Sequence, residues 1–188
     1  MLKERIKHWT RIINIIIKNI IKKIYMLSVD NSRLIEIARK KGVKIGEGCR
    51  LFSANFGSEP YLISIGNHVT ITNGVQFITH DGGVWIFRET KLPNADIFNP
   101  IRIEDNCFIG TNAIILPGVT IGKNSIVGAG SVVTKSIPPN SVVVGVPARI
   151  IKTTDQYYEN IKTKIMNTKH LSETEKRKIL LEKFKHTE

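Results

Sequence analysis

The sequence predicts a mainly β protein, a parallel β-helix of six-residue repeats with α-helical segments at both ends. Three observations support this fold. From Ile103 an aliphatic residue returns at every sixth position through six consecutive repeats, IEDNCF IGTNAI ILPGVT IGKNSI VGAGSV VTKSIP. The fifth position of each repeat holds a small or β-branched residue. Apolar residues at helical steps of three and four occur only towards the two ends of the chain.

Each repeat is expected to form one short strand and one corner. Its first residue points into a common core, its fifth is confined by the next turn, and glycine or asparagine between them accepts the bend. Strands this short cannot bury a face alone, so successive coils must stack on one another. We expect this β-helical body to span residues 42–151.

Residues 1–41 are expected to form a basic amphipathic helical segment. Between residues 3 and 26 apolar side chains follow one helical face and Lys or Arg the opposite face. Two roles remain open for this helix: contact with an anionic membrane surface, or packing on the body or a neighbouring subunit. Cationic residues interrupt the apolar stretch, which argues against a membrane-spanning helix. A second short helix is expected over residues 32–41, ending at Gly42.

Residues 152–188 are expected to form a second helical segment. Pro138 and Pro139 end the coiling because they remove backbone donors. Further on, Ser172 and Glu175 have the spacing of a capping box at the start of the last helix.

The net charge of +12 lies mainly outside the body. Residues 1–41 carry eleven Lys and Arg against three acids, whereas residues 42–151 carry eight against seven. A nucleic-acid-binding domain needs a basic face on its folded body, so we expect no nucleic acid partner. Cys49 and Cys107 are too few for a disulfide framework or a metal cluster and are expected to be small buried fillers.

The repeat is interrupted at length only once, after the segment ITHDGG at residues 78–83. About twenty residues without a repeat follow, an insertion at residues 83–102, and such long irregular segments in a solenoid are usually functional loops. His80 stands at the start of this insertion. Because an imidazole can take a proton from a hydroxyl near neutral pH, His80 is the candidate general base.

The segment IGTNAIILPGVTIGKNSIVGAGSVVTKSIPPNSVVVGVPARIIK resembles the terminal coils of the hexapeptide-repeat acyltransferases, such as galactoside, maltose, serine and xenobiotic acetyltransferases. The resemblance covers roughly residues 42–152, and the helical ends look like the flanks of bacterial polysaccharide-modifying acetyltransferases. It implies a left-handed β-helix, a homotrimer with each active site in the cleft between two prisms, and acyl transfer from a coenzyme A thioester.

The resemblance also implies roles for individual residues. The family's catalytic histidine matches His80, and either Asp81 or Glu59 is a candidate to orient it. Acetyl-CoA is the implied donor. Phe108 and Thr111 match positions beside its pantetheine arm, and Gly128 and Ala129 match positions where backbone amides meet it. Thr134, Lys135, Arg149 and Lys152 match positions near its adenosine and phosphate end, and Gly110 is a further matching residue. Galactoside-type members have tryptophan where Phe108 stands.

For the acceptor, Asn55 matches the asparagine that contacts the sugar in galactoside-type enzymes. Trp85, Phe87 and Arg88 stand at the start of the insertion and are candidates for an aromatic platform under a sugar ring. The alternative is that Trp85 and Phe87 anchor the loop on a neighbouring subunit. Glu59 is a further acceptor-side candidate, with a turn role equally natural. We expect no metal, because the body has only two histidines, His68 and His80, on different faces.

The sequence therefore predicts a cytoplasmic, acetyl-CoA-dependent O-acetyltransferase acting on a saccharide acceptor, either a surface-polysaccharide unit or its precursor. Direct transfer in a ternary complex is expected, because no activated Ser or Cys appears near His80. Association with the inner face of the membrane through residues 3–26 stays open. The alternatives are an N-acetyltransferase of an amino sugar nucleotide, a xenobiotic acetyltransferase, and a non-catalytic β-helix that only assembles partners.

Overall fold

The computed structural model describes Trp9, residues 30–52 and residues 55–185. The helix expected over residues 3–26 therefore lies outside the described residues, apart from Trp9. The chain divides into two compact units, Met1–Thr154 and Asp155–Glu188, each of which is described by itself. Within the described residues, no helix has the length and apolar character needed to cross a membrane.

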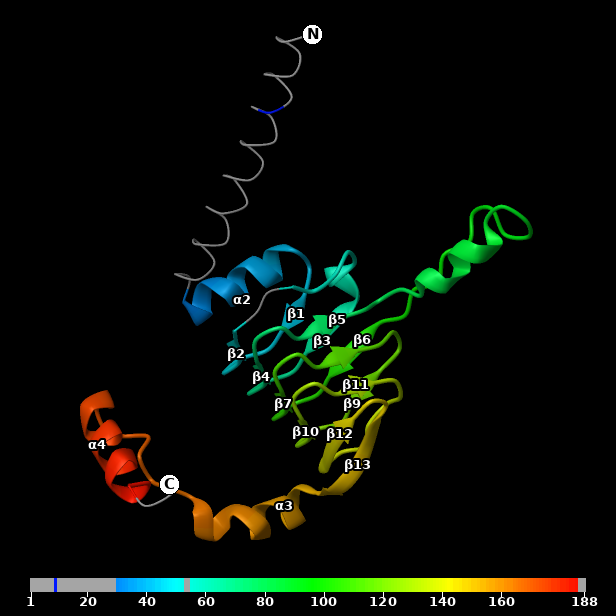
Figure 1. Cartoon of the computed structure of the whole chain (residues 1–188). Helices are drawn as coiled ribbons and strands as arrows, with labels where there is room; N and C mark the ends of the chain where they lie inside the picture. Colours follow the sequence, from blue (N-terminus) through cyan, green and yellow to red (C-terminus); the bar gives the residue numbers. More distant parts are fainter. Residues whose placement is uncertain (1–8, 10–29, 53–54, 186–188) are drawn as a thin grey trace. The chain divides into compact units, whose positions relative to one another are not determined.

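The first unit is a stack of short parallel strands, as the repeat predicted (Figure 1). Sheet A contains β1 (Lys44–Ile45), β3 (Ile63–Ile65), β6 (Ile101–Ile103) and β9 (Thr120–Ile121). Sheet B contains β2 (Arg50–Leu51), β4 (Thr70–Ile71), β7 (Phe108–Ile109), β10 (Ile126–Val127), β12 (Ser141–Gly145) and β13 (Ala148–Thr153). Sheet C contains β5 (Gln76–Phe77), β8 (Ile114–Ile115) and β11 (Val132–Val133).

The pairing of strands explains the repeat length. Arg102 pairs with Thr120, 18 residues further on, so one coil is three six-residue repeats with one strand in each sheet. Ile63, by contrast, pairs with Ile101, 38 residues further on. The insertion thus lengthens one coil by 20 residues without disturbing the pairing of the coils on either side of it.

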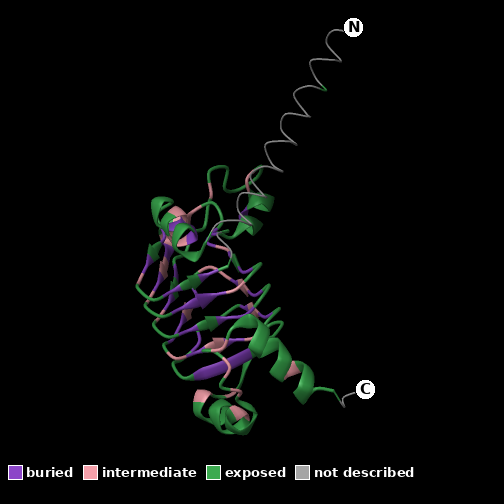
Figure 2. Cartoon of the chain, turned by 90° about the vertical axis from the view of Figure 1, so that its left-hand side faces the viewer, coloured by how far each residue is buried: buried purple, intermediate pink, exposed green. Residues whose placement is uncertain are grey.

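The core runs through the middle of the stack and is formed by the buried side chains of successive coils. Figure 2 shows that the buried residues are concentrated in this stack. First-position residues such as Ile71, Ile109 and Ile121 are fully buried. Cys49 and Cys107 are free and buried, and burial raises the pKa of both thiols. They are small fillers, as expected.

The corner between sheets A and B carries a ladder of polar side chains, one from each of four successive coils. His68, Asn106, Asn124 and Asn140 all have left-handed backbones with φ between 54° and 59°, a conformation that asparagine tolerates better than most residues. His68 Nδ1 donates to Asn106, which donates to Asn124, which in turn donates to Asn140, at 2.7 to 2.9 Å. The ladder ties neighbouring coils together.

The helix α2 (Asn31–Lys40) covers the first coil, close to the expected residues 32–41. Asp30 caps its first turn, and Leu34 and Ala38 are buried. Asn31 accepts a hydrogen bond from Leu51 N of strand β2 at 2.6 Å and donates to the O of Cys49, just before that strand, at 3.1 Å.

The last coil ends differently, because β13 folds back antiparallel on β12. The second unit contains most of α3 (Thr154–Ile161), the short 3-10 helix η3 (Lys162–Lys164) and α4 (Glu173–Lys183). Ser172 and Glu175 form the expected capping box of α4. No described residue of this unit is buried.

Candidate active site

His80 lies on the corner between sheets C and A, where the chain leaves the stack. The 3-10 helix η2 (Gly82–Phe87) follows it, and the insertion extends away from the coils before returning at β6 (Figure 1). The two ends of the insertion are joined beside His80, which forms an antiparallel bridge with Phe98. Asp81 N donates to Ile97 O at 3.0 Å, and Asn99 N donates to Thr79 O at 2.9 Å. These bonds fix the backbone of His80.

Glu59 is the carboxylate that contacts His80. Its Oε2 lies 3.1 Å from His80 Nδ1 and accepts a second hydrogen bond, of 2.6 Å, from the Thr79 hydroxyl. The side chain of Glu59 is 14% exposed and that of His80 45%. Because an ionised carboxylate only accepts hydrogen bonds, we assign the ring proton to Nδ1 of neutral His80, which leaves the Nε2 lone pair free.

The hydrogen bond from Thr79 lowers the pKa of Glu59 below its ordinary value, and that from His80 lowers it further, against an opposing effect of burial. Glu59 is therefore ionised at neutral pH and is suited to stabilising a protonated imidazole. The arrangement fits a histidine that takes up a proton at Nε2 and later releases it.

Glu59 reaches this corner because the first coil is irregular. The segment LFSANFGSEPYLIS is two residues longer than two repeats, and its Phe56 stacks on Phe77 with ring centroids 5.2 Å apart. Gly57 has φ +69°, and a Cβ there would lie 2.9 Å from Phe77 O. This tight passage brings Glu59, just before η1 (Pro60–Leu62), against the corner that follows β5.

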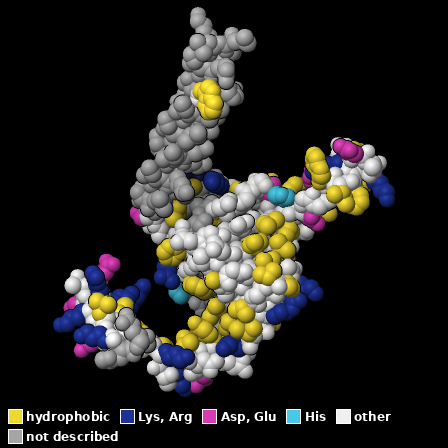
Figure 3. Space-filling view, in the orientation of Figure 1, with side chains coloured by type: hydrophobic (Ala, Val, Ile, Leu, Met, Phe, Trp, Pro, Cys, Tyr) yellow, Lys and Arg dark blue, Asp and Glu magenta, His cyan; other side chains and the backbone are white. Residues whose placement is uncertain are grey.

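A pocket of about 310 Å³ opens beside the pair. Trp85 and Arg88 line it, as do Glu59, His80 and Phe98. The Arg88 guanidinium lies 5.4 Å from the centroid of the Trp85 ring and pairs with Asp96 across the insertion. Trp85 is 67% exposed, and the Phe98 ring stands edge-on to His80 with centroids 6.3 Å apart. Figure 3 shows hydrophobic side chains exposed on the insertion.

Two candidates from the sequence are not brought to the reacting face of His80. Asp81 lines the pocket, but its carboxylate accepts from Gly83 N at 2.8 Å and caps η2, so it does not orient His80. Adjacent residues of an extended chain point to opposite sides, which explains the difference. Asn55 is not among the described residues that line the pocket; its side chain is turned to Gly57 N at 3.4 Å.

Sequence reasoning missed Thr79, Asp96 and Phe98. Thr79 precedes His80 in ITHDGG, so a hydroxyl residue next to the candidate base was visible in the sequence. Asp96 and Phe98 gave none, because their place depends on how the insertion returns. His68 lies on the other corner, in the polar ladder. Among the described residues, no group of three or more His, Cys, Asp or Glu is arranged to hold a metal ion.

The residues expected to bind the donor fall into two groups. Phe108 is in β7, and the corner between sheets B and C carries Gly110, Thr111, Gly128 and Ala129. Thr134 and Lys135 lie instead on the corner between sheets C and A, the same corner as His80 but two coils further along. Lys135 lines a pocket of about 440 Å³ with Arg149 of β13. Lys152 lies further along β13, paired with Val142.

The two glycines of the first group are required by the stacking of the coils. A Cβ on Gly110 would lie 2.5 Å from Ala129 N, and one on Gly128 would lie 2.7 Å from a methyl of Val144. The Gly128 amide donates to Val143 O at 2.8 Å, so it does not offer its N–H to a ligand, contrary to the expectation. Among the described hydrogen bonds, the Ala129 amide has no partner.

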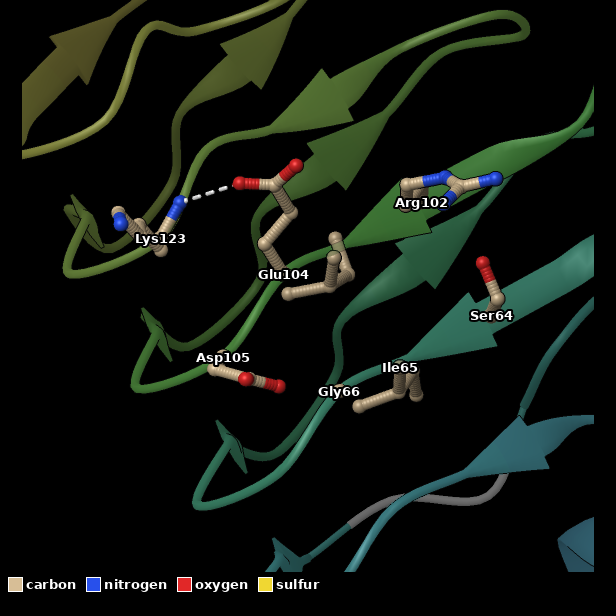
Figure 4. Close-up of a pocket in the computed structure, with 8 residues that line it drawn as sticks. Ser64, Ile65, Gly66, Arg102, Glu104, Asp105 and Lys123 are labelled. Carbon is tan, nitrogen blue, oxygen red and sulfur yellow. Dashed lines mark hydrogen bonds between the residues drawn. The ribbon is translucent and has the colours of Figure 1, made fainter.

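A second hollow, of about 410 Å³, lies over sheet A (Figure 4). Ser64 and Arg102 come from neighbouring strands, and Glu104, Asp105 and Lys123 from the next corner. The carboxylates there accept hydrogen bonds from the backbone of neighbouring coils: Glu104 accepts from Lys123 N at 2.8 Å and Asp105 from Asn67 N at 2.7 Å. None of the expected site residues lines this hollow, so the candidate active site is the pocket at His80.

Known proteins match this chain over its fold and site. It is 52% identical over 167 residues to Protein CapG of Staphylococcus aureus, a match that covers 87% of this chain and 96% of that protein. The family model "Hexapeptide repeat of succinyl-transferase" matches residues 100–135. The chain belongs to the hexapeptide-repeat acyltransferases.

Other members of this family are similar over the β-helix. The galactoside O-acetyltransferase of Escherichia coli K12 is 43% identical over 107 residues, covering 55% of this chain and 51% of that enzyme. A hexapeptide-repeat acetyltransferase of Vibrio cholerae, solved with acetyl coenzyme A, has a TM-score of 0.50 and 35% identity over 60% of this chain and 61% of that one. The hexapeptide-repeat acyltransferase described here has the left-handed parallel β-helix of this family.

Proposed function

We propose that this hexapeptide-repeat acyltransferase transfers an acetyl group from acetyl-CoA to a hydroxyl of a saccharide, a surface-polysaccharide unit or its precursor. The observation that carries the proposal is the Glu59–His80 pair, which opens onto the pocket lined by Trp85. An exposed aromatic ring suits the apolar face of a sugar, and carboxylate oxygens accept from its hydroxyls. The similarity to a galactoside O-acetyltransferase supports a saccharide acceptor, and the similarity to an enzyme solved with acetyl coenzyme A supports acetyl-CoA as the donor.

In the proposed reaction His80 Nε2 takes the proton of the acceptor hydroxyl while the oxygen of that hydroxyl attacks the thioester carbonyl. Glu59 stabilises the imidazolium that forms. When the C–S bond breaks, the imidazolium returns its proton to the departing thiolate, so the ester and coenzyme A leave the base unchanged. Direct transfer is favoured because Cys49 and Cys107 are buried thiols with raised pKa values, unsuited to carrying an acyl group.

For the donor we propose that the phosphates lie at Lys135 and Arg149. Both line one pocket, and their cationic groups suit phosphate. The corner of Lys135 is two strand spacings from that of His80, roughly 10 Å at ~4.8 Å per strand. A donor bound there can extend along the corner towards the base.

The second group, at Phe108, Gly110, Thr111 and Ala129, lies on a different corner of the same prism. We therefore infer a trimer in which the corner between sheets B and C of one copy faces the corner between sheets C and A of the next. Phe108 is exposed in the single chain, which is consistent with a contact of this kind. Membrane contact through residues 3–26 and a cytoplasmic location stay predictions.

Replacing both Lys135 and Arg149 with alanine is expected to raise the KM for acetyl-CoA about tenfold with kcat nearly unchanged. Both side chains are exposed, and an exposed ion pair contributes up to ~1 kcal/mol to binding. The effect should shrink at high salt. Steady-state kinetics with acetyl-CoA as the varied substrate measures it. Lys123→Ala, on the corner between sheets A and B, is the matched control. A loss confined to kcat would contradict the assignment.

Acetyl transfer to a panel of neutral sugars, amino sugars, nucleotide sugars and polysaccharide fragments tests the function itself. We expect release of coenzyme A with a saccharide acceptor and an alkali-labile ester in the product. An amide product would favour the amino sugar alternative, in which nitrogen attacks. Failure of wild-type protein to bind acetyl-CoA in calorimetry would favour a non-catalytic β-helix.

A further inference from the structure

Thr79 is a polar residue enclosed by the coil beside the base. Its exposed fraction is 1%, whereas its neighbour His80 stands at the pocket. Successive residues of an extended chain point to opposite sides, so the Thr79 side chain points into the stack and that of His80 points out. Both nevertheless reach the same atom, because Glu59 crosses this corner from the preceding coil.

The two hydrogen bonds converge on a single oxygen, Glu59 Oε2. The bond from Thr79 is 2.6 Å, shorter than the 3.1 Å contact with His80 Nδ1. The hydroxyl of Thr79 sits on a β-branched side chain with few rotamers and on a backbone held by the Asn99 N–H. Its position is thus fixed by the coil, and it fixes the carboxylate in turn.

The contact also favours the charged form of Glu59. Thr79 is the largest cause of the lowered pKa of this carboxylate. If the hydroxyl were absent, Oε2 would lose its shorter hydrogen bond and the carboxylate would be freer to turn away from the ring. The imidazole could then adopt the tautomer with its proton on Nε2, which cannot accept a proton from the acceptor.

We propose that Thr79 is a positioning residue for acetyl transfer: its buried hydroxyl holds Glu59 Oε2 where that oxygen accepts from His80 Nδ1–H, which keeps Nε2 available as the base. The proposal rests on His80 acting as the general base. Thr79 itself touches neither substrate; it acts on the reaction through Glu59.

The test compares Thr79→Val, which keeps the shape and removes the donor, with Thr79→Ser, which keeps the donor. Thr79→Val should lower kcat about tenfold, less than the ~10² to 10⁴ contributed by a general base. The KM for acetyl-CoA should be unchanged, and the acidic fall of the pH–rate profile should move to lower pH, because a displaced Glu59 stabilises the imidazolium less. Thr79→Ser should restore most of kcat and the profile.

Thr70→Val is the matched control, since it removes another buried threonine hydroxyl from the same coil. That hydroxyl accepts from Arg50 and takes no part in the site. It should lower the melting temperature without moving the pH–rate profile. Wild-type kcat and an unmoved profile in folded Thr79→Val would overturn the proposal. Thr79→Ala is the second variant, for use if valine packs badly at this position. If neither variant folds, the hydroxyl serves to stabilise the coil rather than to position Glu59, and the proposal also fails.

Nitrogen-15 NMR of the His80 ring gives a readout independent of turnover. Wild type should have its proton on Nδ1, and Thr79→Val should have a mixture of tautomers; identical spectra would overturn the proposal. Failure of the proposed function has a different signature. If His80→Ala remained active, the base assignment would fall and the proposal with it, whereas an inactive His80→Ala with a fully active Thr79→Val would overturn only the role of Thr79.

Discussion

Replacing His80 with alanine is expected to lower kcat/KM for acetyl transfer by about 10²- to 10⁴-fold, the contribution typical of a general base. The acceptor hydroxyl is a poor nucleophile at neutral pH, and Nε2 is the free lone pair that the structure directs away from Glu59. The loss should appear in kcat, with little change in the KM for acetyl-CoA, because the proposed phosphate site is two coils away. Initial rates of coenzyme A release measure it.

His68→Ala is the control for this prediction. His68 is the other histidine of the β-helix. It donates to Asn106 on the corner between sheets A and B, away from His80. Its removal breaks one end of the polar ladder and should leave acetyl transfer unchanged. Activity near that of wild type in His80→Ala, or an equal loss in His68→Ala, would show that the base lies elsewhere.

Glu59→Gln is expected to have the second largest effect, a loss in kcat of about 10²-fold or more, because a histidine held in the wrong tautomer cannot act as base. Glutamine keeps the size of glutamate, but it is neutral and its amide NH₂ can donate to the ring in place of the oxygen that accepts. Glu59→Asp is the companion variant: it keeps the charge and shortens the reach, so its loss should be smaller. Comparable rates for wild type and Glu59→Gln would remove Glu59 from the mechanism.

The charge of Glu59 also predicts a pH dependence of stability. Its pKa is lowered from an ordinary 4.5 in the folded chain, so ionised Glu59 stabilises the fold above about that pH. This contribution is lost as the pH falls through the lower folded value. The melting temperature of wild type should therefore exceed that of Glu59→Gln at neutral pH, and the difference should shrink as the pH falls below 4.5. A gap that widens in acid would contradict the assignment.

The fold could be predicted because the repeat is local and regular. One aliphatic residue in six, at positions such as Ile103, Ile109 and Ile121, specifies both the strand and its neighbour in the stack, and the pairing follows that register. His80 could be singled out as the candidate base for the same reason: a regular pattern makes its own interruption visible.

The partner of His80 could not be chosen from the sequence, because it lies where the register fails. Asp81 is adjacent in sequence and Glu59 is 21 residues away in a segment of irregular length. In the structure the stacking of Phe56 on Phe77 and the left-handed turn at Gly57 accompany the approach of Glu59 to the corner, and neither is visible in the sequence pattern. The Gly128 amide was misassigned for a related reason: the sequence did not indicate that its donor is used by the next coil.

The two ends of the stack have a consequence for growth of the molecule. At one end Asn31 bonds to the N–H of Leu51 in strand β2 and to the C=O of Cys49 just before it, as a preceding coil would, and α2 covers the core. At the other end β13 pairs antiparallel with β12, the last parallel strand of sheet B, so a further coil cannot pair with β12 on that side. Exposed strand edges invite pairing with other chains. Both ends of sheet B are therefore closed to a further parallel coil, which favours the side-by-side trimer proposed above over end-to-end growth into a fibre.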